Sequence, residues 1–482
     1  MPVSATEAAQ VRPSARQLAW QELEFYAFIH FTMNTFTDKE WGDGTEEPSL
    51  FDPSELEARQ WARAVKSAGM KGLILTCKHH DGFCLWPSAY TDHSVKSSPW
   101  RGGSGDLVRE VADACREEGL KFGVYLSPWD RHEPSYGDSP AYNAYFLNQL
   151  RELLTGYGDV FCVWFDGACG EGPNGKRQVY DWDAYYALIR ELQPGAVISV
   201  CGPDVRWCGN EAGHTRPSEW SVVPASMRDN EKIQAKSQQE DDGGAFASRI
   251  NSEDDDLGSR AVLAQADEAV WYPAEVNTSI RPGWFYHAAE DDRVLTLAQL
   301  ADLYERTVGG NASFLLNLPP DRRGLIHERD AARLAELGAW LASAYGDNLA
   351  ANAKATASAE ADPEHAAARA TDGKADTHWC PPPGTEQAKL ELDLGAERRF
   401  DRIVLREQIR EGQRVERFRL EAWREDGWQP LAEGTVIGAK RICRVPATTA
   451  SKLRLVIDES RYQPTIAAFE IYLAGDAALS SS

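Results

Sequence analysis

Segments typical of buried β-strands alternate with segments of helical periodicity about eight times before residue 346. Such a chain folds into a parallel sheet covered by helices, which is either closed as a barrel or open as a doubly wound sheet. Polar and aromatic residues follow the ends of successive predicted strands, and barrel active sites are built at these strand ends. The sequence therefore predicts an α/β fold with a (β/α)8-type barrel.

The predicted strands are short apolar runs that end at polar or glycine-containing segments. They lie at residues 25–31, 71–77, 121–126, 160–165, 196–200, 219–223, 270–273 and 312–318. The predicted helices lie at residues 53–70, 105–120, 141–157, 182–192, 295–308 and 327–345. An acidic run, Glu253–Asp256, separates the sixth and seventh strands, and we interpret it as a solvated loop.

The texture of the sequence changes near residue 348, where helical periodicity stops. Short alternating runs follow at residues 389–394, 402–405, 417–423 and 452–457, with turn signals between them. This pattern predicts an antiparallel β-sandwich. We therefore expect a barrel domain over residues 1–346 and a sandwich domain over residues 347–482.

The net charge of −23 argues against nucleic acid or an anionic membrane as a partner, because both need basic surfaces. No run approaches the length of a membrane span, and residues 1–21 contain no apolar signal region. We expect a cytoplasmic protein. The nine cysteines include no CxxC pair, which favours reduced core thiols over a disulfide framework or a zinc site.

Asp166 follows the fourth predicted strand directly, in the sequence WFDG at 164–167. Side chains alternate along a strand, so Cys162, Trp164 and Asp166 should share one face. A carboxylate above an indole suits a sugar pocket, whereas the alternative is an Asp that caps the turn. The fourth strand thus supplies a candidate catalytic carboxylate.

A glycosidase needs a second carboxyl group to protonate the leaving oxygen. Glu211 lies among glycines in the sequence RWCGNEAG at 206–213, on a loop after the fifth predicted strand. Asp204 competes by position, but Arg206 beside it should keep it ionised. Glu211 is therefore the candidate general acid, with a pKa raised by partial desolvation near Trp207.

The other candidate site residues are imidazoles, indoles and hydroxyls at successive strand ends, which suit sugar hydroxyls and the apolar face of a pyranose. Adjacent histidines on an extended segment point to opposite sides, so His79 and His80 make a poor chelate and no catalytic metal is expected. The predicted substrate-binding residues are His30, Glu40, Trp41, His79, His80, Tyr125, Trp129, Trp164 and Trp284.

Together these motifs resemble the glycoside hydrolase family 29 α-L-fucosidases along essentially the whole chain. The matching motifs are FIHF at 28–31, EW at 40–41, KHHDGF at 78–83, YLSPW at 125–129, WFDG at 164–167 and SIRPGWFY at 279–286. The resemblance implies that Asp166 is the nucleophile of a retaining double displacement without a cofactor. It also implies that Trp164 packs near the C6 methyl of fucose.

The segment at 206–213 resembles the form found in the 1,3/1,4-specific subfamily, in which this Glu is the acid/base. That subfamily favours branched, Lewis-type fucosylated oligosaccharides. The phrase ATDGKADTHW at 370–379 resembles the signature of the discoidin, or factor 5/8 C-type, domain, often a carbohydrate-binding module. In that family the Asp-Gly turn, here Asp372 and Gly373, often helps to bind a structural calcium ion.

Three functions remain open from the sequence. The first is a retaining exo-α-1,3/1,4-L-fucosidase. The second is a broad α-L-fucosidase that also cleaves 1,2 linkages and aryl fucosides. The third is a non-catalytic, lectin-like fucose-binding protein, against which the presence of both carboxylates argues.

Overall fold

The computed structural model describes residues 2–172, 174–237, 256–425 and 427–475. Its N-terminal part is an eight-stranded parallel sheet in the order β5-β4-β3-β2-β1-β10-β9-β6. The amide of Val200 donates to the carbonyl of Val205 at 3.1 Å, which brings the first and last strands together. The sheet is therefore a nearly closed barrel, as predicted. Its strands are β1 (Phe25–Ile29), β2 (Gly72–Lys78), β3 (Lys121–Leu126), β4 (Cys162–Phe165), β5 (Val197–Val200), β6 (Arg206–Trp207), β9 (Ala274–Ser279) and β10 (Ala312–Asn317).

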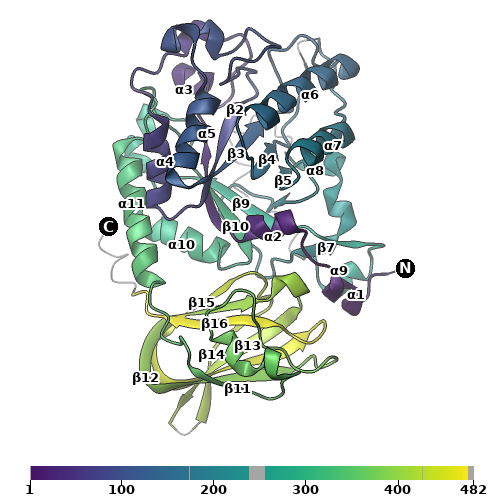
Figure 1. The fold of residues 1–482 in the computed structure, drawn as a ribbon, viewed down its shortest axis with the longest axis vertical. Coiled ribbons are helices and arrows are strands. Elements are labelled where there is room, and N and C mark those ends of the chain that lie inside the picture. Colours follow the sequence, from purple (N-terminus) through teal and green to yellow (C-terminus); the bar gives the residue numbers. More distant parts are fainter. Residues whose placement is uncertain (1, 173, 238–255, 426, 476–482) are drawn as a thin grey trace.

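Amphipathic helices pack against the outside of the barrel (Figure 1). The principal ones are α4 (Ala58–Ser67), α5 (Leu107–Glu118), α6 (Ser139–Gly156), α7 (Trp182–Leu192), α10 (Leu297–Thr307) and α11 (Glu328–Ala344). In α5, Asp106 caps the N-terminus by accepting from the amide of Arg109, and Gly119 ends the helix with φ of 75°. Short helices α1 (Ala5–Gln10), α2 (Ala15–Gln21), α3 (Met33–Thr37), α8 (Asn230–Ser237) and α9 (Arg260–Leu263) lie in the connections. Among the described helices, none is long and apolar enough to cross a membrane.

The predictions for the sixth and seventh strands are wrong. Residues 222–224 and 269–271 form β7 (Val222–Pro224) and β8 (Ala269–Trp271), which pair antiparallel with each other outside the barrel. The barrel uses β6 and β9 instead. Strand β6 has only two residues, and β9 alternates Ala274 and Val276 with Glu275 and Asn277, which are polar but also buried, so neither strand presents a continuous apolar run. Of the predicted acidic loop at 253–256, only Asp256 lies within the described residues.

The C-terminal part is an antiparallel β-structure, and the predicted sandwich is confirmed. Its strands are β11 (Lys354–Ala357), β12 (Ala388–Glu407), β13 (Val415–Arg424), β14 (Gly427–Gly434), β15 (Arg441–Ser460) and β16 (Ile466–Tyr472). The predicted runs at 389–394 and 402–405 are the two ends of β12, which continues through a register shift near Asp393. Trp379, Phe400 and Phe418 are fully buried in its core.

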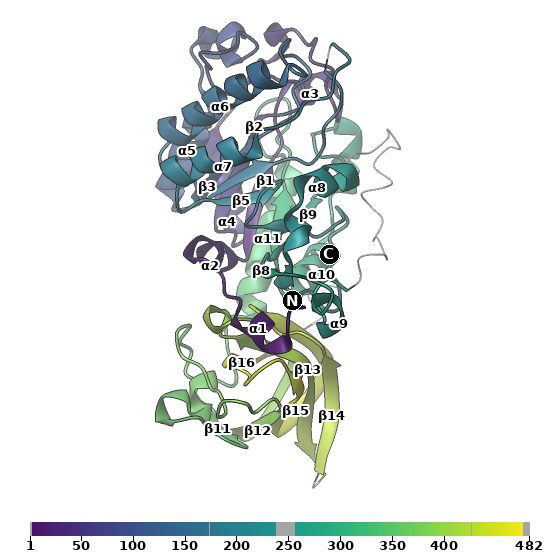
Figure 2. The same ribbon diagram turned by 90° about the vertical axis from the view of Figure 1, so that its right-hand side faces the viewer.

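The sandwich docks at the end of the barrel where the strands begin (Figures 1 and 2). Glu24, which precedes β1, accepts hydrogen bonds from Arg406 and Lys440 of the sandwich. Burial opposes ionisation of Glu24, but the two cations hold its pKa at about 2. Since barrel active sites lie at the opposite end of the strands, the sandwich does not line the candidate site.

Candidate active site

Asp166 follows β4 directly and lies at the mouth of the barrel, with 24% of its side chain exposed. Its Oδ2 accepts a hydrogen bond from the hydroxyl of Tyr125 at 2.8 Å, and its Oδ1 accepts from the amide of Ala168 at 2.9 Å. Burial, and then the charge of Asp166, raises the pKa of Tyr125 well above its ordinary value, so the phenol stays a donor. The imidazole Nε2 of His80 lies 3.7 Å from Oδ2. The carboxylate is therefore held rigidly while part of it stays accessible to a substrate.

Trp164 lies below Asp166 inside the barrel, stacked on Tyr125 with ring centroids 5.3 Å apart. Its indole Nε1 donates to Oε1 of Glu275 at 2.8 Å. Glu275 is fully buried and also accepts from the hydroxyl of Tyr26. Burial raises the pKa of Glu275 to about 7. Sequence reasoning missed this residue, which fixes the orientation of the indole beneath the candidate nucleophile.

Replacing Glu275 with Ala should lower the free energy of unfolding by about 3 kcal/mol or more. The change leaves two buried donors, on Trp164 and Tyr26, without an acceptor, and each costs about 1–3 kcal/mol. Urea denaturation followed by tryptophan fluorescence measures the loss. Glu275→Gln is the matched control, since it keeps one acceptor. Equal losses in the two variants would contradict this role.

Glu211 lies on a loop after β6 rather than directly after the fifth strand. Asn210 fixes this loop, because its Oδ1 accepts from the amides of Ala212 and His214, both at 3.1 Å. The indole Nε1 of Trp284 donates to Oε2 of Glu211 at 3.0 Å. Burial raises the pKa of Glu211 to about 7, and the nearby charge of Asp166 adds to the shift. The loop thus holds a carboxyl group that stays protonated up to near-neutral pH.

Replacing Trp284 with Phe should move the alkaline limb of the activity profile to higher pH. The indole donor stabilises the ionised form of Glu211, so its removal raises the pKa further above 7. The dependence of kcat/KM on pH measures this shift. Trp41→Phe is the control, because Trp41 contacts His80 and Trp129 instead. A limb that stays in place, or moves to lower pH, would disprove the coupling.

Asp204 does not reach the mouth of the barrel. Its Oδ2 accepts from the amide of Ile198 at 2.8 Å and from the guanidinium of Arg190 at 2.5 Å. The predicted partner was wrong, since Arg206 pairs with Glu219 instead. Asp204 is therefore a structural residue that joins β5 to α7.

The three predicted histidines, His30, His79 and His80, are buried at the mouth. The pKa of His30 is lowered to about 4 by burial, and burial also lowers the pKa values of His79 and His80. All three rings are thus neutral near pH 7. Nδ1 of His30 donates to Oδ1 of Asn317 at 2.8 Å, which leaves Nε2 as an acceptor. The sequence did not predict Asn317 as a site residue.

Glu40 connects this site to a neighbouring loop. Its oxygens accept from the amides of Trp284 at 2.9 Å and Phe285 at 3.1 Å, and from Nε2 of His287 at 2.7 Å. His287 also contacts Asp38, and its pKa is raised to about 9, chiefly by its hydrogen bond to Glu40. Glu40 therefore anchors the segment that carries Trp284, a role that the sequence alone did not reveal.

Aromatic rings line the remaining wall. Trp129 lies 5.1 Å from His80 and 5.5 Å from Trp41, measured between ring centroids, and Trp41 is 41% exposed. Trp284 lies 5.2 Å from His30 on another side. Direct contacts thus link the predicted substrate-binding residues into one cluster around Asp166.

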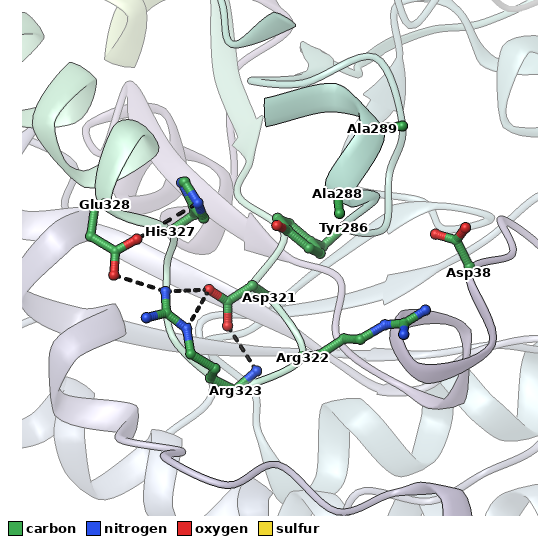
Figure 3. A pocket seen from close by; sticks show the side chains of 9 residues that line it. All are labelled: Asp38, Tyr286, Ala288, Ala289, Asp321, Arg322, Arg323, His327 and Glu328. Atoms are coloured by element: carbon green, nitrogen blue, oxygen red, sulfur yellow. Dashed lines mark hydrogen bonds and ion pairs between the residues drawn. The ribbon is translucent and has the colours of Figure 1, made fainter. Parts of the chain in front are cut away.

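A separate pocket of about 470 Å³ is shown in Figure 3. Asp38 belongs to it and contacts His287, whereas none of the predicted site residues lines it. Arg323 in this pocket pairs with Asp321 and Glu328, and Arg322 donates to the carbonyl of Thr35. We therefore assign the chemistry to the cluster around Asp166 and not to this pocket.

The site combines a carboxylate, Asp166, with a carboxyl group of raised pKa, Glu211, and surrounds them with indoles and neutral imidazoles. This combination is typical of a glycosidase. The sequence model of the α-L-fucosidase family matches residues 9–347. The chain belongs to the α-L-fucosidase family. The factor 5/8 type C domain model matches residues 354–471, which confirms the resemblance of the sandwich to a discoidin domain.

Relatives of the fucosidase family align along nearly the whole chain. Alpha-L-fucosidase 1 of Arabidopsis thaliana is 42% identical over 469 residues, covering 96% of this chain and 87% of its own. The crystal structure of SpGH29 is 37% identical with a TM-score of 0.84, covering 98% of this chain and 99% of its own. A family 29 fucosidase of Ruminococcus gnavus in complex with fucose is 30% identical with a TM-score of 0.83, covering 99% and 97%. The chain is therefore an α-L-fucosidase, a glycoside hydrolase.

Proposed function

We propose that this fucosidase is a retaining exo-enzyme that removes α-1,3- or α-1,4-linked terminal fucose from branched, Lewis-type oligosaccharides. The observation that carries the mechanism is the difference between its two carboxyl groups. Asp166 accepts two hydrogen bonds that stabilise a carboxylate, whereas the pKa of Glu211 is raised to about 7. Such a pair suits one nucleophile and one acid.

In the first step an oxygen of Asp166 attacks the anomeric carbon, while the bond to the leaving oxygen breaks. Glu211 donates its proton to that oxygen. In the second step Glu211 takes a proton from water, whose oxygen attacks the same carbon and releases Asp166. Two inversions leave the anomeric configuration of fucose retained.

The cluster around Asp166 would hold the sugar in this scheme. Neutral His30, His79 and His80 can accept or donate hydrogen bonds to fucose hydroxyls without the cost of burying a charge. The indole of Trp164 offers an apolar surface for the C6 methyl. Trp41, which is 41% exposed, and Trp129 extend the apolar wall toward solvent, where the remainder of a glycan would lie.

The linkage specificity rests on the loop at 206–213, whose sequence resembles that of the 1,3/1,4-specific subfamily. The test is release of fucose from a Lewis a or Lewis x trisaccharide beside 2′-fucosyllactose, with NMR detection of the first anomer formed. Cleavage of the branched substrates alone, with initial release of α-fucose, supports the proposal. Cleavage of 2′-fucosyllactose at a similar rate would favour a broad fucosidase, and initial β-fucose would exclude retention.

We also propose that the Asp-Gly turn of the sandwich holds a structural calcium ion. The hydroxyl of Thr377 donates to the two oxygens of Asp372 at 2.8 and 2.9 Å, and its Oγ1 lies 3.3 Å from the carbonyl oxygen of Lys374, so these oxygens lie close together. This all-oxygen donor set suits calcium. The ion would order the turn and takes no part in the hydrolysis.

Removal of calcium with EDTA should lower the melting temperature of the protein. Adding calcium back at a hundredfold excess over its dissociation constant should raise the free energy of unfolding by about 3 kcal/mol, which corresponds to several degrees in Tm. Scanning calorimetry measures the change. Asp372→Asn should abolish the calcium effect, whereas Asp376→Asn, an exposed neighbour, should preserve it. A wild-type Tm that does not change when calcium is added or removed would exclude the calcium site.

A further inference from the structure

Two histidines and a cysteine converge in the sandwich domain, away from the catalytic cluster. One potential ligand atom from each of His365, His378 and Cys380 lies within 4.8 Å of the others. The rings of His365 and His378 have centroids 4.7 Å apart, and Cys380 is buried. Within the described residues this is the one group of three or more such side chains gathered closely enough to hold a metal ion.

The backbone explains why His378 and Cys380 project together. Trp379 between them forms an antiparallel bridge with Ile466, with both backbone hydrogen bonds at 2.9 Å. In an extended segment the residues on either side of a buried residue share the opposite face. Trp379 is fully buried in the core of the sandwich, so its two neighbours point away from that core.

His365 is brought to this pair by a separate short helix, η7 (Pro363–His365). The amide of Ala361 donates to the carbonyl of Cys380 at 3.0 Å, which ties the start of this segment to the second one. Nδ1 of His365 donates to Oδ1 of Asp362 at 2.9 Å. A carboxylate that holds one ring nitrogen fixes the other nitrogen, Nε2, as a ligand, which is the arrangement found behind most metal-binding histidines.

The donor set points to one class of ion. Thiolate and imidazole together select zinc and related transition metals over calcium or magnesium, which prefer oxygen. We propose that His365, His378 and Cys380 bind a zinc ion, with Asp362 as the positioning residue for His365. The Cys380 thiol loses its proton to solvent on binding, and water completes a tetrahedral site.

The geometry needs only small side-chain movements to accept the ion. Bond lengths of about 2.0–2.3 Å place tetrahedral ligand atoms roughly 3.3–3.7 Å apart. His365 is 32% exposed in its side chain, so it can move toward the others. Asp362 and Glu411 supply negative charge near His378, while the nearby guanidinium of Arg414 donates to the carbonyls of Glu411 and Gln463.

A bound ion would join the segment after β11 to the segment before β12. Both lie outside the described strands and are joined by backbone hydrogen bonds from the amide of Ala361 to the carbonyl of Cys380 and from the amide of Cys380 to the carbonyl of His365. The sandwich contacts the barrel end remote from Asp166, so the ion should stabilise the sandwich without changing fucoside hydrolysis. This zinc site is distinct from the all-oxygen turn at Asp372, because the two use different donor atoms.

The experiment uses the full-length protein stripped with EDTA and titrated with Co²⁺ as a spectroscopic substitute for zinc. One equivalent should bind, with the near-ultraviolet thiolate charge-transfer band and the visible bands of a tetrahedral ion. Zinc should displace it, and calcium should not. Cys380→Ser should abolish the charge-transfer band, whereas Cys443→Ser, at another buried cysteine of the same domain, should retain it.

The positioning role of Asp362 has its own readout. Asp362→Asn should keep the charge-transfer band and weaken zinc affinity about 10- to 100-fold. Unchanged fucosidase activity and circular dichroism verify that each variant is folded. Absence of stoichiometric binding in the wild type, or a charge-transfer band that survives Cys380→Ser, would overturn the zinc site.

Discussion

Asp166→Asn should lower kcat/KM for fucosides roughly 10⁴-fold or more, with little change in stability. The amide oxygen can still accept from Tyr125 or Ala168, so the local fold persists, but no nucleophile remains to form the covalent intermediate. Steady-state kinetics on a Lewis-type trisaccharide and on an aryl fucoside measure the loss. Thermal unfolding of the same samples separates lost chemistry from lost structure.

A second variant tests the nature of the missing group. In Asp166→Gly, added azide should enter the space of the carboxylate and convert an activated aryl fucoside into β-L-fucosyl azide. Asp92→Asn is the matched control, because the Asp92 side chain is 96% exposed and far from any proposed role. Turnover near the wild-type level in Asp166→Asn would mean that another carboxylate is the nucleophile.

Glu211→Gln should lower kcat/KM for oligosaccharides about 10²- to 10⁴-fold and remove the alkaline limb of the pH profile. Glu211 has a pKa of about 7, above that of an ordinary carboxyl group. The acid is thus protonated below pH 7 and is lost as the pH rises through that value, so wild-type activity should fall tenfold per pH unit above it. Glutamine does not titrate, and the residual activity should not follow this limb.

The leaving group provides the discriminating measurement for Glu211. An aryl fucoside with an acidic phenol needs little protonation, so its first step should be far less affected than that of an oligosaccharide. Glu231→Gln, an exposed glutamate of α8, is the control for the charge change. Equal losses on both substrates, with the alkaline limb intact, would assign the acid role to a different residue.

Much of the fold was accessible to prediction, because local periodicity reports burial directly. The helix at 182–192 matches α7, and the strand at 121–126 matches β3, since both present an uninterrupted pattern between clear end signals. Asp166 was predictable for the same reason, because it is the first acidic residue after a clearly apolar strand.

Strands β6 and β9 were not accessible to this reasoning. A two-residue strand has no period, and β9 buries Glu275 and Asn277 because the barrel interior supplies them with partners from other strands. The sequence pattern did not reveal the ligands of the proposed zinc site, for a similar reason. A pattern search expects CxxC pairs, whereas His365 meets His378 and Cys380 only through separate backbone anchors.

The sequence by itself determined the family, the two domains' fold classes and the strand-end position of Asp166, since these depend on contiguous residues. Only the tertiary structure decided the pKa values of the site residues and the side-chain contacts that orient them. The pKa of Glu211, the indole orientation set by Glu275, and the anchoring of Trp284 by Glu40 each need residues distant in the chain. Desolvation and hydrogen bonding are properties of surroundings, and surroundings exist only after folding.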